Sequence, residues 1–382
     1  MTKKVLIVGG GPAGSSAAIH LLKNKHKVIL FEKGDRGRSK ICGEGLTPES
    51  QHILSQFGLL KKVRKIAFKT NEMTVFDLSN KPIPINNTYY TVKRTILDQL
   101  LCDEIAQTNG EVIYNSTITS IKILPEKVIV EDHNKKQYEG DVVILATGAE
   151  TQLAKSLGLV SCEYSAISMR GYAQNNISCK TLEFYFHKKL FPAYGWIFPL
   201  PGNILNIGVY THKDMGPTRD LTKLMNIFYE VLAERYGKPL KLIDQPKGWV
   251  LNTGLITRNI SSDRILLCGE NIASVYNFSG EGIGPSMKSG LLAADTIVEA
   301  NGNYTINKLS IYEQKIKVEL GPVHDGYNKI MRLSKYKVLY FIFTMLLRYS
   351  KRVKKLTEDI IDEKISFQRA LSLKYLASLL FD

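Results

Sequence analysis

The sequence predicts an α/β protein that combines a parallel β-sheet domain with an inserted mixed β-sheet and a helical C-terminal region. Three observations predict this fold class. A strand–turn–helix–strand pattern occupies residues 4–32, strand-like runs recur through residues 68–250, and residues 306–382 have a helical pattern. A chain of 382 residues is also long enough for two domains.

The first strand, helix and second strand form a complete β-α-β unit. Residues 4–8 (KVLIV) are a short apolar strand, and the turn after it places Gly9, Gly11 and Gly14 in a GxGxxG spacing. These glycines permit a tight bend, close approach of backbone to a pyrophosphate, and close packing of helix against strand. Glu32 ends the second strand, where a carboxylate accepts hydrogen bonds from a ribose. An acidic residue there argues against a 2′-phosphate and indicates a Rossmann-type site for FAD or NAD.

Two later blocks favour FAD over NAD. Residues 141–150 are a strand that runs into Ala-Thr-Gly at Gly148, and residues 263–275 are a strand that ends at Glu270. A glycine-rich segment then opens a helix over about 285–299. The N-terminus of this helix would carry a partial positive charge toward the same ligand, which suits a reduced, anionic flavin.

Strand-rich insertions and a helical end are expected around these blocks. The predicted FAD-binding domain is discontinuous, over residues 1–67, 95–160 and 255–305. The predicted substrate-binding sheet comprises residues 68–94 and 161–254, interrupted by a helix at about 219–236, and the helical C-terminal region comprises residues 306–382. Alternating apolar and polar residues predict the strands of the insertions.

Composition excludes several classes of protein. The formal net charge of +15 would attract nucleic acid, anionic lipid or phosphorylated ligands, but no nucleic-acid-binding signature is present, so no nucleic-acid partner is predicted. The five scattered cysteines form no CxxC pair and the seven histidines have no metal-binding spacing. We therefore expect no disulfide framework, no metal site and a reducing, cytoplasmic location. No run reaches the ~18–20 apolar residues of a membrane-spanning helix.

Four motifs, spread over about residues 1–300, resemble those of one known family. They are KICGEGL at 40–46, an Arg-x-x-x-Asp-x-x-Leu helix start at Arg94, YGWIFPL at 194–200 with Gly208 following, and GEGIGPSMKSG at 280–290. The sequence thereby resembles the geranylgeranyl reductases, within the wider p-hydroxybenzoate-hydroxylase-like FAD fold. The Tyr-x-Trp-x-Phe-Pro motif distinguishes this family from other FAD proteins.

The resemblance implies the cofactor contacts. Arg94 and the first helix turn would bind the pyrophosphate, Glu32 the adenosine ribose and Ile118 the adenine, while Glu270 would meet the ribityl–phosphate region. The segments around Cys42 and Gly282 would lie against the isoalloxazine. The predicted FAD-binding residues are Gly9, Gly11, Ala13, Gly14, Glu32, Cys42, Gly43, Gly45, Arg94, Ile118, Gly148, Glu270, Gly282 and Ile283.

Two positions depart from the family pattern. Glu270 stands where the family has aspartate, one methylene shorter. The Ala-Thr-Gly strand continues into Ala149-Glu150-Thr151 instead of Ala-Asp-Gly, which argues against an NAD(P)H-dependent hydroxylase.

The resemblance also implies that Tyr194 and Trp196 line a substrate cavity. Because they alternate along a strand, their side chains share one face. Aromatic residues on one strand face are usually core, and both interpretations hold if the cavity is apolar. Cys42 is also consistent with a small buried filler, and Arg94 with a helix cap or ion pair.

The basic C-terminal region has two interpretations. Residues 326–357 contain nine lysines and arginines and no acidic residue, around the apolar run at 338–347. This run is too short to cross a bilayer but suits either a core helix or an interfacial helix on an anionic membrane. The second interpretation predicts a cytoplasmic protein that is peripheral to the inner face of the membrane.

The resemblance implies an enzyme that reduces C=C bonds of a prenyl chain, in an isoprenoid lipid or prenyl diphosphate. Hydride would come from N5 of reduced FAD, and the proton from Cys42, a water or a protonated flavin position. The alternative is an FAD-dependent monooxygenase, halogenase or dehydrogenase acting on an apolar or aromatic small molecule. No second nucleotide fingerprint is visible, so the electron donor would be transiently bound NAD(P)H or a ferredoxin-like protein.

Overall fold

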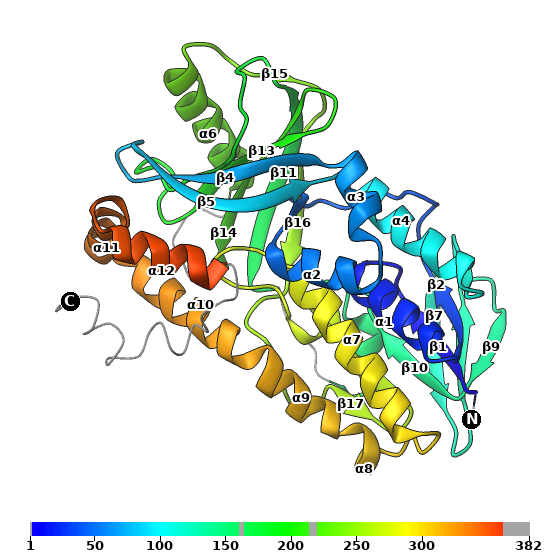
Figure 1. Ribbon diagram of the computed structural model, residues 1–382. Coiled ribbons are helices and arrows are strands. Elements are labelled where there is room, and N and C mark those ends of the chain that lie inside the picture. Colours follow the sequence, from blue (N-terminus) through cyan, green and yellow to red (C-terminus); the bar gives the residue numbers. More distant parts are fainter. Residues whose placement is uncertain (1, 160–163, 214–219, 362–382) are drawn as a thin grey trace.

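The computed structural model describes residues 2–159, 164–213 and 220–361, and three β-sheets organise this part of the chain (Figure 1). The strands are β1 (Lys4–Val8), β2 (Lys27–Phe31), β3 (Gly45–Leu46), β4 (Phe68–Phe76), β5 (Pro82–Thr91), β6 (Glu111–Ile113), β7 (Ile118–Ile123), β8 (Val128–Asp132), β9 (Gln137–Gly140), β10 (Val142–Leu145), β11 (Ala166–Gln174), β12 (Leu182–Tyr185), β13 (Tyr194–Leu200), β14 (Ile204–His212), β15 (Lys241–Leu242), β16 (Lys247–Leu251), β17 (Ser261–Ser262) and β18 (Ile265–Leu267).

Helices cover these sheets and form the C-terminal region. They are α1 (Pro12–Lys23), α2 (Pro48–Gln56), α3 (Leu60–Ile66), α4 (Arg94–Gln107), α5 (Gln152–Ser156), α6 (Leu221–Tyr236), the short 3-10 helix η2 (Gly269–Ile272), α7 (Ile283–Ala300), α8 (Ile306–Leu309), α9 (Ile311–Glu319), α10 (Gly321–Ser334), α11 (Lys337–Tyr349) and α12 (Lys351–Ile361).

The first sheet has the order β17-β18-β10-β1-β2-β6, and all its neighbours run parallel except β17 and β18. Its central strands are apolar and buried after their first residue, because α1 packs on one face of the sheet and the small sheet β7-β8-β9 packs on the other. The carboxyl ends of β1, β2, β10 and β18 meet at one edge, which brings the glycine turn, Glu32, Gly148 and Glu270 together. The predicted Rossmann-type α/β class is confirmed.

Two glycines let α1 approach its neighbours closely. A Cβ atom on Gly14 would lie 2.0 Å from the carbonyl oxygen of Gly9, and a Cβ atom on Gly290 of α7 would lie 2.1 Å from that of Ala13. Helices α1 and α7 therefore lie side by side and pack backbone against backbone (Figure 1). Larger side chains would move the N-terminus of α1 out of position.

The second sheet follows the order β15-β11-β14-β13-β12-β4-β5-β3, with β16 also paired to β11. Helix α6 covers one face, where the Phe228 ring occupies the space that a Cβ on Gly195 would need, 2.6 Å away. The opposite face carries the side chains of Tyr194, Trp196 and Phe198. Residues 68–91 and 166–251 supply its strands as predicted, except that β3 joins from the segment 1–67 by pairing with β5.

The C-terminal helices close the far side of the molecule. Helix α9 packs on α7, and α10, α11 and α12 turn back so that α12 contacts β5 (Figure 1). The predicted helical character is confirmed for residues 306–361, and residues 362–382 lie outside the described part. The predicted domain boundaries themselves stay a prediction.

We predict that Gly14→Val lowers both stability and cofactor content. Overpacking typically costs about 1–3 kcal/mol, and here the added atoms meet backbone that cannot move aside cheaply. Urea unfolding should show the loss, and the visible absorbance of reconstituted protein should show less bound FAD. Gly321→Ala is the matched control, because no atom lies within 4 Å of its added Cβ. Equal FAD content in the two variants would contradict the packing argument.

Candidate active site

A cavity of about 1420 Å³ runs from the glycine turn after β1 to the C-terminal helices. Fifteen of the sixteen predicted site residues line it, although they come from segments far apart in the sequence. The exception is Gly14, which packs behind the turn. One end of the cavity is polar and lies at the edge of the first sheet, and the other end is apolar and lies between β4, β5 and helices α10, α11 and α12.

Two guanidinium groups meet the N-terminus of α1 at the polar end. A Cβ on Gly11, the residue before α1, would lie 3.6 Å from a terminal nitrogen of Arg38 and 3.9 Å from one of Arg94. Arg94 is also held by a bidentate ion pair with Asp98, at 2.7 and 2.8 Å. The two interpretations of Arg94 are therefore compatible, since the ion pair fixes the side chain beside the turn. Helix N-terminus and guanidinium groups together suit a pyrophosphate.

Glu32 lies where the adenosine ribose is expected, but it already has several partners. Its carboxylate accepts hydrogen bonds from the Gly10 and Gly34 amides at 3.0 and 2.9 Å, and pairs with Arg38 at 2.8 Å. A carboxylate offers about four acceptor sites, so capacity remains for a hydroxyl donor. Ile118, at the start of β7, lines the cavity as well. The sequence prediction did not include Arg38 as a site residue. Its position shortly after Glu32 is the only sequence signal that could have indicated this role.

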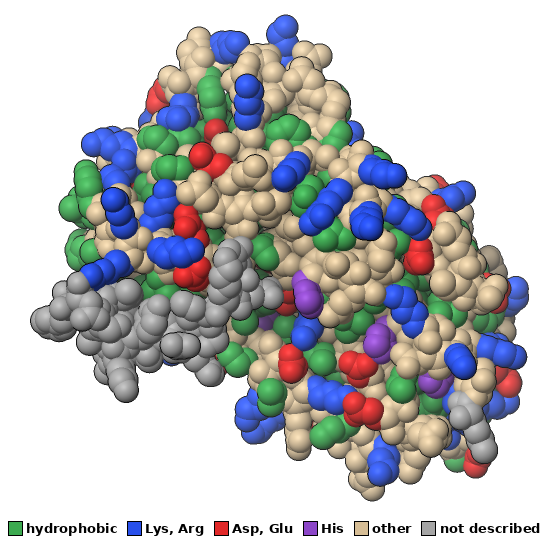
Figure 2. All heavy atoms as spheres, in the orientation of Figure 1, with side chains coloured by type: hydrophobic (Ala, Val, Ile, Leu, Met, Phe, Trp, Pro, Cys, Tyr) green, Lys and Arg blue, Asp and Glu red, His purple; other side chains and the backbone are tan. Residues whose placement is uncertain are grey.

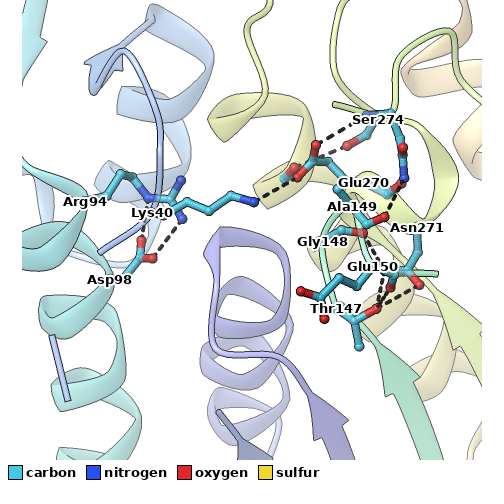
Figure 3. Close-up of polar contacts among 12 residues, drawn as sticks. Lys40, Arg94, Asp98, Thr147, Gly148, Ala149, Glu150, Glu270, Asn271 and Ser274 are labelled. Carbon is cyan, nitrogen blue, oxygen red and sulfur yellow. Dashed lines mark hydrogen bonds and ion pairs between the residues drawn. The ribbon is translucent and has the colours of Figure 1, made fainter. Parts of the chain in front are cut away.

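Lys40 bridges the polar end toward Glu270 (Figure 3). Their charged atoms lie 3.6 Å apart, and a Cβ on Gly148 would approach Glu270 at 3.6 Å and Lys40 at 3.9 Å. The loop after β10 is fixed in turn by Asn271, whose amide donates to the Gly148 carbonyl at 3.2 Å. Lys40, Glu270 and Gly148 thus border one channel, where the ribityl chain is predicted. Lys40 belongs to the KICGEGL motif, but the sequence prediction names only Cys42, Gly43 and Gly45 of this motif as FAD-binding residues.

A buried hydrogen-bond cluster joins the Cys42 loop to the second sheet. The Asn206 amide donates to the Cys42 carbonyl at 2.8 Å and to the Glu44 carboxylate at 3.0 Å, and its oxygen accepts from the Trp196 indole at 2.8 Å. Glu44 also accepts from the Tyr172 hydroxyl at 2.8 Å and has a φ of 66°. The tryptophan of the family motif therefore positions the Cys42 loop through Asn206, two residues before Gly208.

The Cys42 thiol is neutral in this setting. Burial raises its pKa, although Arg94 opposes the shift, and its Sγ accepts from the Glu44 amide at 3.3 Å. A thiolate nucleophile needs the opposite shift. The Cys42 side chain instead offers a small, uncharged surface. The rings of Trp196 and Phe198 pack against its neighbour Gly43.

An aromatic wall lines the route from the polar end to the apolar end. The hydroxyls of Tyr194 and Tyr210 donate to the backbone carbonyls of Ser279 and Asn277, each at 2.5 Å. Burial raises both pKa values, so both rings are uncharged. Phe184 meets Phe198 edge-on, with ring centroids 5.1 Å apart. The apolar end continues between side chains that include Met73, Val75, Leu182, Leu346 and Leu356.

The polar end fits FAD. The turn needs glycine at its first position, since Gly9 has a φ of 112° and a Cβ there would lie 2.2 Å from the Ala146 carbonyl oxygen that follows β10. Anion-binding groups, a ribose-facing carboxylate and the start of α7 at Gly282 all border the same cavity. Sequence position alone had indicated this arrangement for FAD, and the geometry agrees with it.

Comparison with known proteins identifies the class. Residues 3–177 match the pyridine nucleotide-disulphide oxidoreductase family. Digeranylgeranylglycerophospholipid reductase 2 of Methanosphaera stadtmanae is 26% identical over 85% of this chain and 86% of its own length. Menaquinone reductase of Mycolicibacterium smegmatis is also 26% identical, over 76% of this chain and 75% of its own.

Among solved structures, a geranylgeranyl bacteriochlorophyll reductase-like protein of Thermoplasma acidophilum shares the fold with a TM-score of 0.78. The two sequences are 22% identical, and the alignment covers 99% of this chain and 96% of the Thermoplasma chain. The protein is thus an FAD-dependent oxidoreductase, as the sequence predicts. Within that class, the resemblance to geranylgeranyl reductases is confirmed.

We predict that Asn206→Leu destabilises the protein by more than about 2 kcal/mol. The change leaves the Trp196 indole, the Cys42 carbonyl and the Glu44 carboxylate without their partner, and each buried unsatisfied group costs about 1–3 kcal/mol. Urea unfolding provides the measurement. Gln174→Leu on the neighbouring strand β11 is exposed and should stay within about 0.5 kcal/mol of the unmodified protein. Equal stabilities would show that the cluster does not join the two sheets.

Proposed function

We propose that this protein reduces C=C bonds in the prenyl chain of an isoprenoid lipid. The observation that carries the proposal is the continuous cavity, in which a polar end with anion-binding groups opens along an aromatic wall into an apolar end. The relatives in Methanosphaera and Mycolicibacterium are named as reductases of a geranylgeranyl lipid and of menaquinone. An apolar chain suits such a lining because each buried CH₂ contributes about 0.8 kcal/mol.

The predicted cofactor contacts support this assignment. We assign the pyrophosphate to Gly11, Ala13 and Arg94, with Arg38 added by its geometry, and the ribityl–phosphate region to Glu270. The isoalloxazine is assigned to the space between the Cys42–Gly45 loop and the start of α7 at Gly282 and Ile283. When bound and reduced, FAD supplies the hydride for the reaction.

The residues of the chain position the alkene and keep water away from it. An isolated C=C bond has no carbonyl to polarise it, so its orientation determines the rate. Tyr194, Trp196 and Phe198 present ring faces to the cavity, with their polar atoms already bonded within the protein or absent. The wall therefore offers no competing hydrogen bond to a ligand and favours a hydrocarbon.

The alternative class comprises FAD-dependent monooxygenases, halogenases and dehydrogenases of small aromatic molecules. A compact substrate would not need the apolar extension that continues past Tyr340 to Leu356. We therefore favour the prenyl substrate. For the electron donor we propose NAD(P)H or an acidic ferredoxin-like protein, to which the net charge of +15 would be complementary.

Helix α11 supports a peripheral position on the inner face of an anionic membrane. One side of the helix, which includes Leu339 and Phe343, lines the cavity. The other side exposes Val338, Phe341 and Tyr349, and Val338 and Tyr349 are 70% and 74% exposed. Figure 2 shows hydrophobic side chains beside lysines and arginines at the left edge of the molecule, where α11 lies in Figure 1. Of the helices within residues 2–361, none is long and apolar enough to cross a membrane.

This arrangement supports the interfacial interpretation of residues 338–347 over the core interpretation. Only Tyr340, Thr344 and Leu347 of α11 are buried. The side of the helix that lines the cavity is apolar, and its outer side also exposes apolar side chains. Such a helix suits the interface between headgroups and acyl chains, with basic residues contacting anionic lipid. A lipid chain could then pass from the membrane into the cavity.

We predict that enzyme reduced with dithionite saturates prenyl lipids, and that Trp196→Ala slows this reaction about a hundredfold. Loss of the indole widens the wall and frees the Cys42 loop, and a misplacement of about 1 Å can reduce a rate that much. Mass spectrometry of the lipid products, expressed per bound FAD, provides the measurement. Trp196→Phe keeps the ring and should recover part of the rate. Unchanged prenyl lipids after incubation with the reduced unmodified enzyme would refute the function.

We predict that the full-length protein sediments with anionic vesicles and less with neutral ones. Added salt should weaken binding, because the Debye length at physiological salt is only ~8 Å. Changing Lys351, Arg352, Lys354 and Lys355 to glutamine should weaken it further, and Phe341→Ser should remove part of the apolar contribution.

The matched control changes four cations elsewhere. Lys61, Lys62, Arg64 and Lys65 of α3 are exposed, and their replacement by glutamine alters the net charge by the same amount. If this variant loses as much vesicle binding as the α12 variant, binding follows total charge and the proposed surface is wrong.

A further inference from the structure

Glu281 lies between the two segments that are assigned to the flavin ring. It occupies the Gly280–Gly282 turn directly before α7, and its side chain lines the cavity. One carboxylate oxygen accepts from the Thr47 hydroxyl at 3.3 Å and from the Gly284 amide at 2.9 Å. Thr47 directly follows β3 and therefore the Cys42–Gly45 loop. The carboxyl group is thus fixed at the junction of that loop with α7, facing the reaction space.

The neighbours of Glu281 leave its charge without a close partner. Within the described residues, no cation lies at ion-pair distance from the Glu281 carboxylate. The positive charge of Arg94 lowers the pKa of Glu281, but the Arg94 side chain is paired with Asp98. The hydroxyls of Tyr194 and Tyr276 donate elsewhere, to the Ser279 carbonyl and to the Glu49 carboxylate. The titratable and charged groups around the turn come from several elements. They are Glu49 of α2, Arg94 of α4, Tyr194 of β13, Tyr327 of α10, and Tyr276 in the segment before the turn.

Removal from water makes this carboxyl group a usable acid. Desolvation raises the pKa of Glu281 to about 7, against smaller opposing effects of the Gly284 amide and the Thr47 hydroxyl. At neutral pH about half of the molecules therefore hold the proton. A proton donor is most effective when its pKa is close to the working pH. The Cys42 thiol is less suitable because burial raises its pKa above that of an ordinary thiol.

We propose that Glu281 delivers the proton to the alkene carbon that does not receive the hydride. This inference rests on the proposed function and names the residue that supplies its acid. Reduced FAD would supply a hydride, whose electron pair forms the first C–H bond. The electron pair of the broken π bond moves to the other alkene carbon and forms the second C–H bond with the carboxyl proton. Glu281 is left as a carboxylate and regains a proton from water before the next turnover.

The test uses Glu281→Gln in the full-length holoenzyme, with Glu49→Gln as the matched control in the same cavity. Oxidation of the reduced enzyme by a prenyl lipid is followed in a single turnover across pH. In the unmodified enzyme the rate should fall about tenfold per pH unit above about pH 7. Glu281→Gln should be slower by ~10²–10⁴-fold and lack this decrease, whereas Glu49→Gln should keep it.

A second measurement needs neither substrate nor turnover. A carboxyl group that keeps its proton only in the folded state stabilises the fold at low pH, and this contribution is lost as pH rises from about 4.5 to about 7. Thermal unfolding should therefore show the melting temperature of Glu281→Gln rising relative to the unmodified protein between pH 5 and about 8.

The outcomes separate the two proposals. If Glu281→Gln retains the rate or its decrease above pH 7, Glu281 is not the proton donor, even when the stability data show a raised pKa. If the relative melting temperature does not change with pH, the carboxyl group is an ordinary one and the assignment also fails. If the unmodified enzyme binds FAD but converts no prenyl lipid at any pH, the proposed function itself fails and this assignment falls with it.

Discussion

The hydrogen bonds of the fully buried Asn206 side chain hold the two halves of the protein in register. The amide stands on β14 of the second sheet, yet two of its three partners belong to the loop that follows β2 of the first. The Tyr172 hydroxyl and the pairing of β3 with β5 also tie this loop to the second sheet, but Asn206 joins the loop directly to Trp196 of the aromatic wall. The cost of leaving these polar groups unpaired in an apolar interior makes the arrangement effectively rigid. The position of the Cys42 loop against the aromatic wall is therefore held by this side chain together with those contacts.

Local sequence patterns predicted the first sheet and its glycine turn well. The GxGxxG spacing, the apolar strand and the terminal acid all lie within 32 residues, so their geometry is determined by short-range backbone constraints. The Tyr-x-Trp-x-Phe-Pro strand was likewise identified correctly, and its alternation placed Tyr194 and Trp196 on the same face. Gly14 differs from the prediction that it binds FAD: it lies outside the cavity lining and lets the helix pack closely on the turn, as the third glycine of the motif does.

Contacts between distant segments were not predictable in this way. Arg38, Lys40, Glu44 and Asn206 become part of the site only because the chain crosses from one sheet to the other and back. Glu44 carries no local signal of burial, since an isolated glutamate in a glycine-rich loop is usually solvated. For Glu281 the same holds, because the apolar surroundings that raise its pKa come from β13, α2 and α10 rather than from its own turn. Residues 338–347 were ambiguous for a different reason: an apolar helix with both a cavity side and an outer side has no distinctive period.

The cavity has one further consequence, because cofactor and chain-binding regions are parts of the same continuous space. Ligands that share walls such as the Cys42 loop and the start of α7 cannot bind independently. Any free energy by which the prenyl chain favours the ordered loop must equally favour the cofactor, since coupling between two binding equilibria is reciprocal. Lipid availability would then influence how firmly the flavin is retained, and enzyme without its lipid would lose cofactor more readily than enzyme that holds it.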